Sequence, residues 1–183
     1  MKNVLDFLEK AAESFPDKTG FTDADREATF MQVMENSKRI ASSLKGIPKN
    51  MPVAIMLDRN INCIEAMFAA VYAGCFYAVI DIHSPSSRIS HISEALEPKA
   101  VITDRRMLDM TQTLFVPADI IVYEEAVNNK IDTEFITAVR ASMIDTDPLY
   151  VLFTSGSSGV PKGAVLSHRS VISYTEWVCG EFG

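Results

Sequence analysis

Short apolar runs alternate with helix-like patterns along most of the chain, and this alternation constrains the fold more than any other feature. The runs lie at residues 53–57, 75–80, 100–103, 120–122 and 149–153. Strands that are apolar throughout are typical of parallel sheets whose two faces are both covered by helices. The sequence therefore predicts an α/β fold with a mostly parallel sheet and helices on both of its faces.

Helix start signals precede several of the segments between these runs. Asn60 is placed as an N-cap, and Thr29 opens a capping-box pattern. Ser84 and Pro85 resemble an N-cap followed by the first residue of a helix. Residues 126–147 have weak periodicity, so a surface stretch is expected there.

Composition excludes two classes of partner. The chain has 17 basic and 24 acidic side chains, a formal charge of −7, whereas nucleic-acid binders carry a basic footprint. Its longest uncharged run, residues 66–80, is shorter than the roughly 20 residues that span a bilayer. No nucleic-acid or membrane partner is expected. Cys63, Cys75 and Cys179 show no Cys-x-x-Cys spacing, which favours small core residues in a reducing, cytoplasmic setting.

The histidines and the carboxylate next to a predicted strand are weak candidates for catalysis. His83 and His91 have no cysteine at ligand spacing, so no metal site is expected there. His168 is expected at the surface, near the start of a last helix. Asp81 follows a strand, where ligands often bind, but a turn or cap role is expected for it.

One loop, residues 154–163, combines chemically useful residues as no other segment does. It holds three of the eight glycines, four hydroxyl residues and Lys162. Glycines let backbone N–H groups approach an anion, hydroxyls donate to phosphate oxygens or bind a phosphate-bound magnesium ion, and lysine adds positive charge. The spacing matches neither a Walker A loop nor a dinucleotide fingerprint. A flexible linker is the alternative, but the strand before and Pro-Lys-Gly after the loop favour a phosphate-binding loop.

The stretch LYVLFTSGSSGVPKGAVLSH, residues 149–168, resembles the glycine-rich nucleotide signature of the adenylate-forming (AMP-binding) superfamily. That superfamily includes acyl-CoA synthetases, luciferases and adenylation domains of nonribosomal peptide synthetases. Residues 29–44 and 72–81 resemble its first two core motifs, and the second motif favours the amino-acid-activating branch. Residues 174–177 further resemble the D-alanine–carrier protein ligases. Cys75 and the pair at 79–80 depart from the commoner residues of the second motif.

The resemblance implies a reaction, two cofactors and a set of site residues. ATP and Mg²⁺ would serve adenylation of an amino-acid carboxylate, followed by transfer to the thiol of a carrier protein. Lys162 would stabilise the phosphates during attack of the carboxylate, and Thr154 would reach Mg²⁺ through a phosphate. The residues implied in nucleotide binding are Thr154, Ser155, Gly156, Ser157, Ser158, Gly159 and Lys162.

The family's chains are much longer than this one. Its later motifs have no counterpart here, so residues 1–183 are expected to be the N-terminal portion of an adenylation domain without its C-terminal half and mobile lid domain. This portion alone is expected to be inactive. Two alternatives stay open: an acyl- or aryl-CoA synthetase, and an inactive truncated module that at most binds nucleotide or self-associates through a surface left uncovered.

Overall fold

The computed structural model describes residues 3–154 and 161–182, in which six strands form one sheet in the order β6-β5-β3-β4-β7-β8. These strands are β3 (Pro52–Met56), β4 (Phe76–Val79), β5 (Ala100–Thr103), β6 (Asp119–Val122), β7 (Pro148–Thr154) and β8 (Lys162–Ser167). Neighbouring strands are parallel, except that β8 runs antiparallel to β7. The predicted mostly parallel sheet is confirmed.

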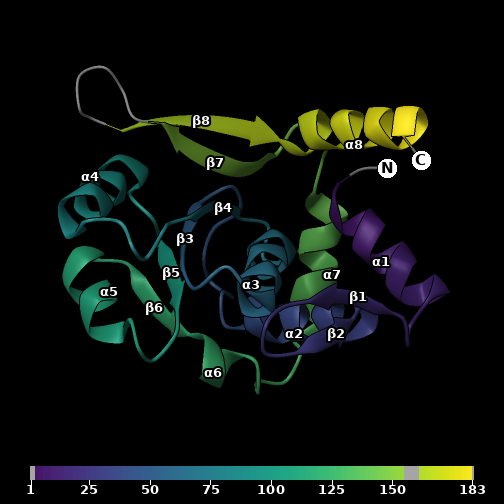
Figure 1. Cartoon of the computed structure of the whole chain (residues 1–183), viewed down its shortest axis with the longest axis horizontal. Coiled ribbons are helices and arrows are strands. Elements are labelled where there is room, and N and C mark those ends of the chain that lie inside the picture. Colours follow the sequence, from purple (N-terminus) through teal and green to yellow (C-terminus); the bar gives the residue numbers. More distant parts are fainter. Residues whose placement is uncertain (1–2, 155–160, 183) are drawn as a thin grey trace.

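Helices cover both faces of this sheet, as Figure 1 shows. They are α1 (Leu5–Ser14), α2 (Phe30–Ser42), α3 (Ile61–Tyr72), α4 (Ser86–Leu96), α5 (Leu108–Leu114), α6 (Tyr123–Ala126), α7 (Thr133–Ser142) and α8 (His168–Phe182). A separate antiparallel pair, β1 (Thr19–Thr22) and β2 (Glu27–Thr29), lies beside α2 and α3. No helix in the described part of the chain is long and apolar enough to cross a membrane.

The central strand β3 shows why its sequence is apolar throughout. Val53 and Ile55 point into a core shared with α1, α2, α3 and α7, whereas Ala54 and Met56 point into a second core under α4 and α5. All four side chains are fully buried. Alternate residues of a strand face opposite sides of the sheet, so a strand between two cores needs no polar face.

Two of the predicted caps are confirmed and one is displaced. The Asn60 side chain accepts a hydrogen bond from the backbone N–H of Cys63, and Thr29 forms the full capping box with Gln32. The expectation for Pro85 was wrong by one residue. Its backbone is extended, with φ −55° and ψ 142°, so it is the N-cap of α4 and Ser86 is the first helical residue.

Residues 126–147 lie mostly at the surface, as expected, but they contain a helix, α7, that the sequence did not predict. The Asp132 side chain caps this helix by accepting a hydrogen bond from the backbone N–H of Phe135. Ile136 is buried, while Phe135 and Val139 pack against the first core. This apolar stripe is narrow and the rest of the helix is polar, which explains the weak periodicity.

The cysteines divide into two groups. Cys63 and Cys75 are buried, as predicted, and burial raises the pKa of their thiols to about 11 and about 12. The prediction was wrong for Cys179, which lies exposed on α8.

Candidate phosphate-binding site

Strands β7 and β8 form a hairpin that holds the two ends of the predicted phosphate loop together. Thr154, the last residue of β7, lies directly opposite Lys162, the first residue of β8. The Thr154 hydroxyl donates to the Lys162 carbonyl oxygen at 3.4 Å, and both residues are exposed. A hydroxyl residue and a lysine are therefore paired at the carboxyl end of a parallel strand, where ligands of such sheets bind.

The predicted loop is too long at its far end, since Lys162 and Gly163 lie within β8. A Cβ atom on Gly163 would approach Val151 Cγ2 to 2.9 Å and the Phe153 ring to 3.2 Å. The glycine thus lets the two strands carry these bulky side chains on one face. Its role in the structure is packing within the hairpin, in addition to any part in anion binding.

Five of the predicted nucleotide-binding residues fall outside the described residues: Ser155, Gly156, Ser157, Ser158 and Gly159. Their contacts with phosphate stay predictions. Thr154 and Lys162 suit an anion, because one donates a hydrogen bond and the other carries positive charge. Within the described ranges, no three His, Cys, Asp or Glu side chains are grouped to hold a metal ion. A magnesium ion reached from Thr154 through a phosphate also stays a prediction.

The sheet continues from β8 into α8 through a buried histidine, which corrects the expectation that His168 lies at the surface. His168 is 1% exposed, and its Nδ1 accepts a hydrogen bond from the backbone N–H of Val4 at 3.3 Å. Burial, helped by the charges of Arg140 and Lys49 and opposed by Asp147 and Asp145, lowers the pKa of His168 to about 4. The neutral imidazole therefore fastens the end of β8 to the N-terminal segment.

A second anchor lies at Glu65, which the sequence did not single out. This carboxylate is fully buried in α3, where it accepts hydrogen bonds from Asn36 Nδ2 at 3.0 Å and Tyr123 Oη. Arg26 forms an ion pair with it at 3.1 Å. Burial, together with the nearby carboxylate, raises the pKa of Tyr123. The only sequence signal was an acidic residue inside an otherwise apolar helix, and its partners are distant in the chain.

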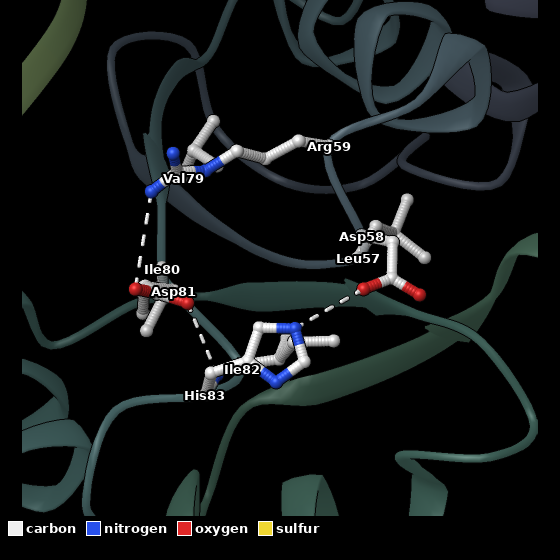
Figure 2. A pocket seen from close by; sticks show the side chains of 8 residues that line it. All are labelled: Leu57, Asp58, Arg59, Val79, Ile80, Asp81, Ile82 and His83. Atoms are coloured by element: carbon white, nitrogen blue, oxygen red, sulfur yellow. Dashed lines mark hydrogen bonds and ion pairs between the residues drawn. The ribbon is translucent and has the colours of Figure 1, made fainter. Parts of the chain in front are cut away.

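A cleft of about 480 Å³ lies on the same edge of the sheet, beyond the ends of β3 and β4. Its polar residues are Asp58 and Arg59 after β3, and Asp81 and His83 after β4, as Figure 2 shows. The Asp81 side chain accepts a hydrogen bond from the backbone N–H of His83 at 3.0 Å, which confirms its predicted turn role. Because β4 pairs with β7, this cleft lies one strand away from Thr154.

Comparison with known proteins covers nearly the whole chain. The family described as AMP-binding enzyme matches residues 8–182. Tyrocidine synthase 1 of Brevibacillus parabrevis is 26% identical over 100% of this chain and 17% of its own length. The D-alanine–D-alanyl carrier protein ligase of Lacticaseibacillus paracasei is 26% identical over 99% of this chain, and that of Staphylococcus aureus is 28% identical over 97%. In both cases the match covers 35% of the relative's own length. The chain thus spans about a third or less of these curated relatives.

Solved structures agree in fold. VinN in complex with 3-methylaspartate superposes with a TM-score of 0.83 at 15% identity, over 100% of this chain and 53% of that one. A fatty acyl-adenylate ligase from L. pneumophila superposes with a TM-score of 0.81 at 21% identity, over 100% of this chain and 33% of that one. The N-terminal subdomain of NpsA from Klebsiella oxytoca superposes with a TM-score of 0.72 at 22% identity, over 93% of this chain and 42% of that one. At these identities the likeness concerns the fold.

Proposed function

Because the chain belongs to the AMP-binding enzyme family, we propose that residues 1–183 form the N-terminal portion of an adenylation domain. The whole protein would use ATP and Mg²⁺ to adenylate an amino-acid carboxylate, and would pass the aminoacyl group to the thiol of a carrier protein. Relatives named as D-alanine–carrier protein ligases and tyrocidine synthase 1 support the amino-acid branch. The free cysteines support a cytoplasmic setting.

The observation that carries the proposal is the pairing of Thr154 with Lys162 across the β7–β8 hairpin. In adenylation a carboxylate oxygen bonds to the α-phosphorus of ATP while the bond to pyrophosphate breaks. Mg²⁺, when bound, offsets charge on the phosphates. The Lys162 ammonium group would oppose the negative charge that develops on the leaving pyrophosphate, and the Thr154 hydroxyl would orient a phosphate oxygen.

The experiment is amino-acid-dependent exchange of labelled pyrophosphate into ATP, measured on the protein as its own cells make it. A panel of D-alanine, other amino acids, fatty acids and aryl acids would be offered. The proposal expects exchange with an amino acid and none with the fatty or aryl acids. Exchange with a fatty or aryl acid, followed by transfer to coenzyme A, would establish the acyl- or aryl-CoA synthetase alternative. No exchange with any acid would refute adenylation.

One feature favours the second candidate, a module that self-associates. Val165 of β8 is 58% exposed, and β8 lies at the edge of the sheet; Leu152 of β7 is 56% exposed on the opposite face. Exposed apolar edge strands pair readily with other strands. Sedimentation of the 183-residue chain at several concentrations tests this: a concentration-dependent dimer would support it, and a monomer throughout would refute it.

A further inference from the structure

The cleft beyond β3 and β4 lies at a point where the connections of the sheet diverge. From β3 the chain passes to α3, which packs in the first core, and from β4 it passes to α4, which packs in the second. Neighbouring parallel strands whose connections leave toward opposite faces open a crevice at their carboxyl ends. Open α/β sheets bind ligands in crevices of this kind.

Figure 2 shows that charged groups of both signs line this crevice across the two loops. Arg59 lies 3.8 Å from Asp81 Oδ2, and His83 Nε2 lies 3.7 Å from Asp58 Oδ1. Both separations exceed the length of a good hydrogen bond between such groups. By contrast, Arg106 contacts the other oxygen of Asp58 at 2.6 Å. Both pairs are therefore loose, and the Arg59 side chain, which is 86% exposed, is free to turn away from Asp81 and admit a ligand.

An apolar pocket of about 370 Å³ adjoins the cleft and shares two residues with it, Arg59 and Val79. Its apolar lining includes Phe21 of β1 and Ile64 and Met67 of α3. Val79 is 42% exposed although it ends a central strand. An apolar surface thus lies directly beside the long Arg59–Asp81 pair.

We propose that this composite site binds a free α-amino acid with an apolar side chain. The ligand carboxylate would pair with Arg59, its ammonium group with Asp81, and its side chain would fill the pocket lined by Val79, Ile64 and Met67. A ligand with only one charge would leave the opposite group of the Arg59–Asp81 pair without a partner. A zwitterion gives each of them a partner once the exposed Arg59 side chain turns away from Asp81.

The inference rests on the cleft and not on the proposed adenylation, and the site is lined by none of the residues of the predicted phosphate loop. It predicts binding without ATP. The test is a titration of the ¹⁵N-labelled 183-residue chain with L-leucine, in which the NMR chemical shifts of the backbone amides are measured. Shifts are expected at residues 58–59 and 79–83, and none at Gly46, which follows α2.

Three probes separate the contributions of the ligand groups. 4-Methylpentanoate lacks the ammonium group of leucine, 3-methylbutylamine lacks its carboxylate, and glycine lacks its side chain. Each is expected to bind at least tenfold more weakly than L-leucine. Equal binding of either singly charged probe would overturn the inference, and so would failure of L-leucine to bind at millimolar concentration.

Two variants locate the site. Arg59→Gln is expected to weaken L-leucine binding at least tenfold, and because this side chain is 86% exposed, the fold should be kept, as circular dichroism would verify. Arg105→Gln is the matched control, since Arg105 is an exposed arginine paired with Glu125 outside the cleft. Unchanged binding in Arg59→Gln would overturn the inference. Pyrophosphate exchange tests the proposed adenylation independently, because it needs ATP and the binding titration does not.

Discussion

The Nδ1 atom of His168 accepts a hydrogen bond from the backbone N–H of Val4, which is 164 positions earlier in the chain. This bond joins the segment before α1 to the first residue of α8, directly after β8. The strand that carries Lys162 is therefore fixed at its far end by an imidazole that must stay neutral, so that its Nδ1 can accept the hydrogen bond from the amide N–H.

His168 makes stability depend on pH. Its pKa is about 4 in the folded protein, below its ordinary value of 6.5. The unfolded chain therefore binds a proton first as pH falls, so the folded state loses stability below about pH 6.5 and the loss ends near pH 4. Between pH 7 and 5 we expect the free energy of unfolding to fall by ~2 kcal/mol from this group.

Urea unfolding at the two pH values measures this effect. His168→Gln should be less stable at pH 7 but should lose ~2 kcal/mol less than the wild type on acidification. His91→Gln, at an exposed position of α4, is the control and should behave as the wild type. Equal acid sensitivity of His168→Gln and wild type would show that the imidazole is not the group responsible.

The buried carboxylate of Glu65 should be sensitive to the loss of its partners. Glu65→Ala leaves Arg26, Asn36 and Tyr123 without their shared acceptor, and we expect a loss of ~3 kcal/mol. Tyr123→Phe removes one donor and should cost ~1 kcal/mol. Thermal unfolding measures both changes. Glu94→Ala, which removes an exposed glutamate bonded to Ser90, should change stability by less than about 0.5 kcal/mol.

Three glycines should respond to alanine in different ways. Gly74 has φ +74°, and a Cβ atom there would lie 3.0 Å from Val139 Cγ1, so Gly74→Ala should cost ~2 kcal/mol. Gly46 has φ +106° with open space around it, and its substitution should cost ~1 kcal/mol. Gly180 lies in α8 with open space, so Gly180→Ala should stabilise by ~0.5 kcal/mol. Denaturant midpoints measure all three, and the same sign at Gly74 and Gly180 would contradict this account.

Lys162 should affect the rate of adenylation more than the binding of the amino acid. In the protein as its own cells make it, Lys162→Ala should lower the rate of pyrophosphate exchange ~100-fold or more, because the proposed role of its charge is mainly in the transition state. The KM for the amino acid should change by only a few fold. Lys130→Ala, at an exposed position between α6 and α7, is the control. A raised KM with an unchanged maximal rate would assign Lys162 to substrate binding alone.

The parallel strands were predictable because they lie between two cores, and such burial leaves a direct mark on the sequence, as in Val53–Met56. Strand β8 was not predicted, and its first two residues, Lys162 and Gly163, were assigned to the loop. It is an exposed edge strand, so burial leaves little pattern in its sequence. Helix α7 escaped prediction for a related reason, since only a narrow stripe of it meets the core.

The candidate site was predictable only in part. Thr154 and Lys162 lie in one continuous motif, so local composition was enough to single them out as candidates. The partners of Glu65 lie in the residues just before β2, in α2 and in α6. The cleft around Arg59 and Asp81 likewise joins two loops that are about twenty positions apart in the chain. Groups that meet only after the chain has folded leave no shared local pattern, and the buried His168 belongs to this class.

The register of the β7–β8 hairpin limits how the length of this region can vary during evolution. Side chains alternate across a strand, so inserting or deleting one residue within β8 would turn Lys162 to the opposite face of the sheet relative to Thr154. A change of two residues would restore its direction. Viable variants with altered length in β8 should therefore differ from this chain by even numbers of residues.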